Sequence, residues 1–556
     1  MKKNLVKVLT LALAAATVAS MSALTMPVYA EETPTISVTN VSDPNAANLT
    51  VTAYQIVKVN ATSGAYELCD ATNAKIANPE QPTSEEVITI AKNIRDNAAN
   101  LTAIKMTKEN GTNTYKATNV EAGLYIVLAS GADAVVYNPA LVAWNVKEPR
   151  NNSVDMKTKF AFDSDAYLKA SESGFDKSIV DSSMNNTEGD AVAFGDTVKF
   201  KLDKMTIPYY SDDYTSVMYT IEDNLDPSAF QGVKNISVKV GGKEVALNET
   251  DYTLTYNGIA AGSGTTGSSG SNATNFKIEF TDKFIRDNAE KSVEITYDSV
   301  LMDTAGLNYA ENKNTATLKY SNDPSDATKY KEKTDTTYHY TFGIDADVDA
   351  QDPSPDKDTE TYELNKVTDA GETFETATNT AGKSTMRSPK KLAGAEFALY
   401  SDEAMTTTVR TATSDANGHI QFKGLDTGTY YMKETKAPAT YTLNTNIYKI
   451  EIAATLNEEG VMTQYNITTT LSTDNGKTYT ACGDATYTNT PVVNADDTVT
   501  NSIVPTVTPV EIVDTQLAAL PATGGEGTIA ITIGGALGMA GFLTLYITNK
   551  KKKKAE

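Results

Sequence analysis

The sequence predicts an all-β protein built from several β-sandwich domains. Thr, Val, Tyr and Ile dominate its apolar stretches, while Gly, Asn and Asp interrupt them at short intervals. Segments such as 49–57 and 123–128 have the pattern of half-buried strands, and few long amphipathic helical patterns occur. Because the chain has 556 residues, it is long enough for three or four domains of roughly 100–200 residues each.

The N-terminus has the pattern of a secretory signal peptide. Three lysines precede an apolar run at residues 8–16, and small residues lead to Ala30. We predict that residues 1–30 are removed by cleavage before Glu31. The alternative, a membrane anchor, fits less well because the apolar run is short.

The C-terminus combines a short motif with a membrane-spanning pattern. The motif is Leu520-Pro521-Ala522-Thr523-Gly524, and it precedes an apolar stretch at 528–548 and five lysines. The stretch is long enough to span a bilayer, with the lysines on the cytoplasmic side. The arrangement resembles the cell-wall sorting signal of Gram-positive surface proteins, in which a membrane sortase cuts between the threonine and the glycine. A permanent single-pass anchor would leave the motif unexplained.

Charge and composition exclude several classes of function. The formal net charge is −23, and processing to residues 31–523 removes eight lysines and two glutamates, which brings it to −29. This charge repels nucleic acid, so none is expected as a partner. Cys69 and Cys482 are too few for a disulfide framework. With only His339 and His419, neither a paired-imidazole metal site nor a Ser/His/Asp triad can be assembled, and we expect no cofactor and no enzyme.

An acidic insertion at 345–358 is the remaining candidate for metal binding. Four aspartates in it give a DxDxD-like pattern that could hold calcium: Asp345, Asp347, Asp349 and Asp352. The glycine and the distal glutamate of an EF-hand loop are absent. We therefore predict a solvated acidic loop and no metal site.

Turn signals and composition divide the chain into five parts. These are the signal peptide at 1–30, an N-terminal domain at 31–159, a middle domain at 160–328, a third domain at 329–515, and a linker with the sorting signal at 516–556. Strands that recur with turn signals favour immunoglobulin-like sandwiches. One helix is expected in the N-terminal domain, at 84–97, with an apolar face formed by every third or fourth residue.

Two segments of the third domain resemble a known module. They are residues 392–400 and 430–438, with Gly424-Leu425 between them. The pair is similar to the collagen-adhesin B-type domain, whose second segment is the pilin E-box, YxLxETxAPxGY. The matching residues are Tyr430, Glu434, Thr435, Ala437, Pro438 and Tyr441. Thr440 stands where the family has glycine.

The middle domain extends this resemblance. Residues 314–324 resemble the final strand of the isopeptide-forming domain of backbone pilins, and residues 219–225 resemble its acid-bearing strand. Together with 137–142, the chain resembles a sortase-dependent backbone pilin, or fimbrial protein, over nearly all of its mature length. The resemblance implies an intramolecular amide between a lysine on the first strand and an asparagine or aspartate on the last. A buried lysine becomes a neutral nucleophile, and a buried protonated acid can polarise the acceptor carbonyl.

For the middle domain, the resemblance implies that Lys177 attacks Asn314 with the assistance of Asp223. Alternation of Lys177 with apolar neighbours places it on one face of a strand. Lys169 and Glu222 are the alternatives.

For the third domain, the corresponding donor is Lys366 and the assisting acid is Glu434. Asp514 is the expected acceptor because it lies just before the sorting signal, where the family commonly has Val-Asn-Thr. Asn489 and Asn501 are the alternatives.

Polymerisation in this family requires a lysine near the end of the N-terminal domain to attack the sortase-bound threonine of the next subunit. Lys159 is the candidate and Lys157 the alternative, although the usual Tyr-Pro-Lys motif is missing. The resemblance implies a secreted pilus shaft subunit whose partners are a sortase, identical subunits and peptidoglycan, with a possible host surface ligand. A monomeric wall-anchored adhesin is the alternative.

Overall fold

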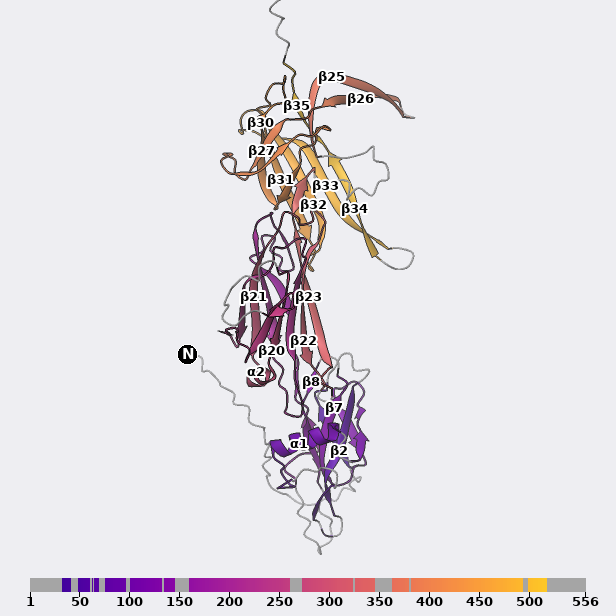
Figure 1. Ribbon diagram of the computed structural model, residues 1–556. Coiled ribbons are helices and arrows are strands. Elements are labelled where there is room, and N and C mark those ends of the chain that lie inside the picture. The colour runs from indigo at the N-terminus through magenta and orange to yellow at the C-terminus, as the bar shows by residue number, and fades with distance from the viewer. Residues whose placement is uncertain are drawn as a thin grey trace, which may run out of the picture. The chain divides into compact units, whose positions relative to one another are not determined.

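The computed structural model describes two compact units, which are treated separately below (Figure 1). Unit 1 comprises Met1–Tyr340 with Asn457–Val461, and unit 2 comprises Thr341–Leu456 with Met462–Glu556. The structure describes residues 33–41, 49–60, 63, 65–69, 76–96, 101–132, 135–145, 160–260, 273–323, 326–345, 363–379, 382–493 and 499–517. Within these ranges the protein is nearly all β, with two helices, and the all-β prediction is confirmed.

The first part of unit 1 contains two main sheets, with strand orders β10-β1-β6-β5 and β3-β2-β7-β9, the latter joined by β4 on β2. A small sheet pairs β11 with β8. The strands are β1 Thr35–Thr39, β2 Thr50–Val59, β3 Tyr66–Leu68, β4 Ala103–Lys105, β5 Thr107–Lys108, β6 Tyr115–Thr118, β7 Gly123–Ser130, β8 Val136–Tyr137, β9 Ala140–Trp144, β10 Asp165–Tyr167 and β11 Ala170–Ser171.

The helix α1 (Ser84–Arg95) forms close to where the sequence predicts it and ends two residues earlier than expected. A capping box starts it: the Thr83 side chain accepts the backbone N–H of Glu86, and the Glu86 side chain accepts that of Thr83. Its apolar face, with Ile90 and Ile94, packs against β7.

Strand β7 is fully buried along nearly its whole length, which corrects the expectation of a half-buried strand. Leu124 and Ile126 belong to the cluster that contains the residues of α1, whereas Tyr125 and Val127 belong to the core on the other face. Because α1 covers the face that would otherwise meet water, both sets of side chains are apolar.

The rest of unit 1 is a larger pair of sheets. One has the order β12-β14-β21-β16-β17 and the other β13-β23-β22-β15-β20-β18-β19. The elements are β12 Asp176–Val180, β13 Gly189–Ala191, β14 Thr197–Thr206, β15 Tyr219–Leu225, β16 Lys234–Val240, β17 Lys243–Glu244, β18 Tyr252–Tyr256, β19 Ile259–Ala260, β20 Asn275–Phe280, α2 Asp282–Asp287, β21 Ser292–Val300, β22 Asn312–Ser321 and β23 Tyr330–Tyr340. Apolar side chains from both sheets form one core cluster.

Strand β23 extends this core beyond the boundary that the sequence suggested at residue 328. It pairs with β22 along the whole of that strand, from Asn312 opposite His339 to Ser321 opposite Tyr330. The segment at 314–324 is therefore followed by one more strand of the same sheet. The division between the compact units falls after Tyr340 for this reason.

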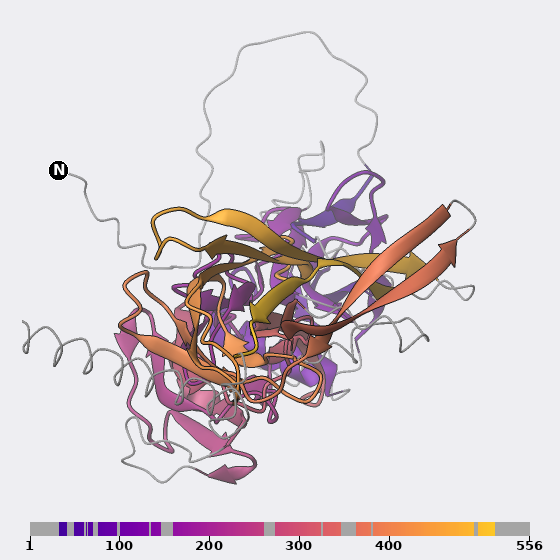
Figure 2. The same ribbon diagram turned by 90° about the horizontal axis from the view of Figure 1, so that it is seen from above.

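Unit 2 contains sheets with the orders β24-β29, β26-β25-β35 and β28-β27-β30-β31-β32-β33-β34. The β25–β26 pair forms a long ribbon that Figure 2 shows extending away from the rest of the unit. The strands are β24 Phe342–Ile344, β25 Leu364–Asn379, β26 Gly382–Lys391, β27 Glu396–Tyr400, β28 Thr408–Thr413, β29 Phe422–Leu425, β30 Gly428–Lys436, β31 Ile447–Leu456, β32 Met462–Ser472, β33 Thr480–Val493, β34 Val499–Thr508 and β35 Val510–Asp514.

None of the helices in the described part of the chain has the length and apolar character needed to cross a membrane. The predicted span at 528–548, the signal peptide at 1–30 and the sorting motif lie outside the described residues.

Candidate functional site: two buried lysine–carboxyl centres

Unit 1 encloses a lysine, an aspartate and an asparagine in its core. Lys177 comes from β12, whereas Asp223 comes from β15 and Asn314 from β22, which are neighbouring strands of the facing sheet. Asn314 pairs with Leu225, two residues along β15 from Asp223, so both side chains project from the same face. All three residues are 0% exposed, and Lys177 Nζ donates to Asp223 Oδ2 at 2.5 Å.

A fourth residue, Tyr297 of β21, lies at the centre of this group. Its hydroxyl accepts a hydrogen bond from Lys177 Nζ at 2.7 Å and one from Asn314 Nδ2 at 2.7 Å, and it donates to Asp223 Oδ2 at 2.8 Å. The sequence alone does not point to this tyrosine. Alternation along β21 places it on the core face, but nothing in the sequence indicates which polar groups it would meet there.

Burial sets the protonation of these groups. It lowers the pKa of Lys177, and it raises the pKa of Asp223 and that of Tyr297. Nearby aromatic rings maintain the apolar surroundings, since Lys177 Nζ lies 5.1 Å from the centre of the Phe200 ring and 5.2 Å from that of Tyr297. The centre therefore favours a neutral amine beside a protonated carboxylic acid, which is the combination that amide formation requires.

Unit 2 encloses a second centre, in which Lys366 of β25 lies between two carboxyl groups. Its Nζ hydrogen-bonds to Asp514 Oδ1 and lies 3.3 Å from Glu434 Oε1 of β30, and the three side chains are no more than 1% exposed. Parallel pairing of β25 with β35 brings Asp514 close, because Lys366 pairs with Ile512 and Thr368 with Asp514. Burial is the main cause that raises the pKa of Glu434 to about 7.

The alternative residues lie away from both centres. Lys169 has a side chain that is 35% exposed and pairs with Glu290 at 3.3 Å, and Glu222 faces outward toward Lys277 and Lys319. Asn489 Nδ2 donates to the Met462 carbonyl at 3.5 Å. Asn501 belongs to β34, whose partner is β33 and not β25.

The remaining predicted site residues lie outside the described part of the chain. They are the candidate polymerisation lysines Lys157 and Lys159 and the sorting motif Leu520, Pro521, Ala522, Thr523 and Gly524.

Asp345 does not belong to a solvated acidic loop, which corrects the sequence expectation for this residue. It is 1% exposed, and its carboxylate accepts the backbone N–H groups of Leu364 and Ile420 at 3.0 and 3.1 Å. Its own N–H donates to Glu363 at 2.9 Å. Burial, followed by the charge of Glu363, raises the pKa of Asp345. The other three aspartates of the pattern lie outside the described residues.

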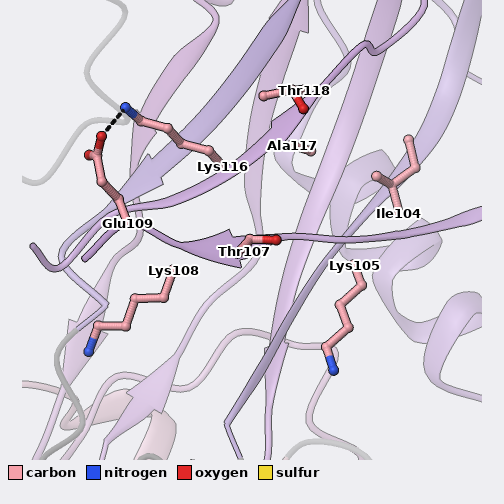
Figure 3. A pocket seen from close by; sticks show the side chains of 8 residues that line it. All are labelled: Ile104, Lys105, Thr107, Lys108, Glu109, Lys116, Ala117 and Thr118. Atoms are coloured by element: carbon pink, nitrogen blue, oxygen red, sulfur yellow. Dashed lines mark hydrogen bonds and ion pairs between the residues drawn. The ribbon is translucent and has the colours of Figure 1, made fainter.

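A surface hollow of about 380 Å³ lies on unit 1 beside β4, β5 and β6 (Figure 3). Its one drawn ion pair joins Lys116 to Glu109 at 2.7 Å, and both side chains are about two-fifths exposed. The lining residues are Ile104, Lys105, Thr107, Lys108, Glu109, Lys116, Ala117 and Thr118. Because these charged groups are solvated, the hollow lacks the desolvated nucleophile and acid that distinguish the two buried centres.

Three family models match the chain. Residues 31–174 match the T6 antigen Ig-like domain, residues 367–477 match the prealbumin-like fold domain, and residues 512–554 match the LPXTG cell wall anchor motif. Taken with the tandem β domains, these matches indicate a cell-wall-anchored surface protein that is similar to the sortase-dependent major pilins. The predicted location at the cell wall and the predicted sandwich fold are thereby confirmed.

The chain is similar to the trypsin-resistant surface T6 protein of Streptococcus pyogenes serotype M6. The two are 24% identical over 510 residues, which cover 85% of this chain and 86% of the relative. The solved T6 backbone pilin of the same serotype is 18% identical, with a TM-score of 0.53, over 88% of this chain and all of that one. At this level of identity the structural similarity shows a shared fold.

Proposed function

We propose that this chain is the shaft subunit of a pilus, in which a sortase joins identical subunits covalently and finally attaches them to peptidoglycan. The observation that carries this proposal is the pair of buried lysine–carboxyl centres, one in each compact unit, in a protein with a wall-anchor motif. A shaft must withstand tension along its length. Covalent links inside each unit would carry that tension in place of hydrogen bonds, each of which is worth only about 1 kcal/mol net.

The chemistry of each link follows from its acceptor. In unit 1, Lys177 Nζ would attack Asn314 Cγ, and ammonia would leave. In unit 2, Lys366 Nζ would attack Asp514 Cγ, and water would leave. Asp223 and Glu434 are the acids that would polarise the two carbonyl groups. Neither reaction requires a cofactor, and each happens once per molecule.

Intact mass measures both links at once. A recombinant 31–519 fragment should be about 17 Da lighter because of the Asn314 link and about 18 Da lighter because of the Asp514 link. Lys177→Met should abolish only the first loss and Lys366→Met only the second. If the unsubstituted fragment had the mass calculated from its sequence, with neither loss, both links would be contradicted.

Polymerisation is tested on the cell wall. Wall extract boiled in detergent should give a ladder of high-mass species when the protein is detected with an antibody. Thr523→Ala should remove the ladder, because the sortase forms its acyl intermediate at that residue. Lys159→Arg should also remove the ladder, whereas Lys157→Arg, the matched control, should leave it intact.

A single band in unsubstituted cells would favour the alternative of a monomeric wall-anchored adhesin. A ladder that Lys157→Arg abolishes and Lys159→Arg preserves would move the attachment point to Lys157. Binding to a host surface ligand would be a second role of the same shaft, and it requires its own binding measurement.

A further inference from the structure

We propose that Tyr297 is a catalytic residue of the unit 1 link, and that its hydroxyl carries the proton from the attacking Lys177 to the leaving nitrogen of Asn314. This inference rests on the proposed amide between those two residues. It assigns a task to a side chain that the sequence analysis did not select.

The geometry matches the task because one oxygen atom contacts both nitrogens. Tyr297 Oη lies 2.7 Å from Lys177 Nζ and 2.7 Å from Asn314 Nδ2. It also donates to Asp223 Oδ2 at 2.8 Å, which orients the phenol. The ring is held firmly, since it stacks on Phe200 at 4.9 Å and meets Phe276 edge-on at 5.0 Å between centroids.

Burial makes such a carrier necessary. Lys177, Asp223 and Asn314 are fully buried and Tyr297 is 1% exposed, so bulk water does not reach the two nitrogens. When an amide forms from an amine and a carboxamide, one proton must pass from the first nitrogen to the second. The hydroxyl of Tyr297 is the group that already hydrogen-bonds to both.

The step balances without any additional reagent. Lys177 Nζ forms a bond to Asn314 Cγ, and a protonated Asp223 stabilises the charge that develops on Oδ1. Nζ then gives a proton to Tyr297 Oη, while the hydroxyl proton, which points to Asp223 Oδ2 before the reaction, turns to Nδ2 and is transferred there. The Cγ–Nδ2 bond breaks, ammonia leaves, and the tyrosine is regenerated in its original form.

Protonation of the phenol supports this role over that of a base. Burial is the main cause that raises the pKa of Tyr297 far above its ordinary value. The hydroxyl therefore keeps its proton at neutral pH and can accept one proton as it gives up another.

Unit 2 provides an internal comparison. Among the residues that the structure describes, the aromatic ring over Lys366 Nζ is that of Phe397, which has no hydroxyl, at 5.7 Å from Nζ to the ring centre. The acceptor there is Asp514, whose leaving group is water, and two carboxyl groups already contact the amine. Loss of the Tyr297 hydroxyl should therefore affect the link in unit 1 and leave the link in unit 2 unchanged.

The test is Tyr297→Phe in the 31–519 fragment, with intact mass followed over time after purification or refolding. We expect the unit 1 link, read as the decrease of about 17 Da in mass, to form about 100-fold more slowly, which is the lower end of the range for removing a general acid–base group. The decrease of about 18 Da from the unit 2 link should stay complete. Tyr219→Phe is the matched control. Tyr219 is equally buried in the same core, and its hydroxyl bonds to Ser173 at 2.8 Å, away from the reacting atoms.

The outcomes separate the two proposals. If the unsubstituted protein loses about 17 Da and Tyr297→Phe does so at the same rate, the catalytic role is wrong and the link stands. If the unsubstituted protein never loses that mass, the link itself is wrong.

Two further measurements exclude a purely structural effect. In a Lys177→Met background no link can form, so adding Tyr297→Phe there reports only what the hydroxyl contributes to folding, and we expect similar thermal midpoints. The unsubstituted protein should also form its link more slowly in D₂O than in H₂O. Equal rates in the two solvents would contradict proton transfer in the slow step, even if the phenylalanine variant failed to fold.

Discussion

Single buried residues set the chemistry of this protein, and His339 shows the effect clearly. Its ring lies edge-on to Phe200 and Phe230, at 5.2 Å from each ring centre, and its Nδ1 lies 3.1 Å from the Asn312 carbonyl oxygen. Burial lowers the pKa of His339 to about 3. The folded protein therefore holds a neutral imidazole, whereas the unfolded chain takes up a proton near pH 6.5.

This difference predicts a loss of stability in acid. As the pH drops, the unfolded state binds the proton before the folded state does. The contribution of neutral His339 to the free energy of unfolding is therefore complete above about pH 6.5 and falls by about 4 to 5 kcal/mol in total as the pH drops toward 3. His339→Gln keeps an N–H for the Asn312 carbonyl and removes the titration. Denaturant unfolding of unit 1 at pH 7 and pH 4 should show a smaller loss in the variant. Equal losses in both proteins would show that the imidazole does not titrate as we infer.

At the scale of the element, the turn that follows β30 explains why a glycine is common in the E-box. The Tyr441 N–H donates to the Pro438 carbonyl at 3.1 Å, which places Thr440 at the third position of a β-turn. Thr440 has a φ of +75°, a conformation that glycine adopts readily and that β-branched residues rarely do. The turn therefore forms despite the substitution, at a cost in backbone strain.

Thr440→Gly should relieve this strain. The side chain of Thr440 is exposed, so little packing is lost, and we expect unit 2 to gain up to about 1 kcal/mol. Calorimetry of the mature chain would show a higher midpoint for unit 2. Ala439→Gly, at the neighbouring exposed position, is the control and should give no gain. A lower midpoint for Thr440→Gly would mean that the threonine makes a contribution that outweighs its strain.

Strand patterns also mark the limit of what the sequence can predict. Alternation placed Lys177 on one face of a strand, and the resemblance to pilin segments, the E-box among them, implied Asp223, Lys366 and Glu434. The structure buries all four side chains. The central place of Tyr297 depends on how one sheet packs on the other, and local patterns do not encode that packing.

The same limit explains the other differences between expectation and structure. β7 was expected to be half-buried, but a distant helix covers its second face. Asp345 was expected to be solvated, but its carboxyl group is buried and accepts the backbone N–H groups of Leu364 and Ile420, which lie beyond the insertion. In each case, a contact between segments distant in sequence determined the environment of the residue.

At the scale of the whole molecule, each proposed link lies inside one compact unit. Lys177 and Asn314 are 314 − 177 = 137 positions apart in unit 1, and Lys366 and Asp514 are 148 positions apart, with the intervening chain mostly in unit 2. Loops of this size lower the entropy of the unfolded chain enough to stabilise each unit by about 5 kcal/mol. The stabilisation should therefore be local to the unit that contains the link.

Scanning calorimetry of the 31–519 fragment tests this locality. Lys177→Met should lower the midpoint of unit 1 by about 10–20 °C and leave that of unit 2 in place, and Lys366→Met should do the reverse. Methionine is the chosen replacement because it is uncharged and similar in length to lysine. It also leaves behind carboxyl groups whose pKa is raised by burial, so little uncompensated charge remains. If either substitution lowered both midpoints equally, the two units would unfold as one cooperative body. The prediction that each link stabilises only its own unit would then be wrong.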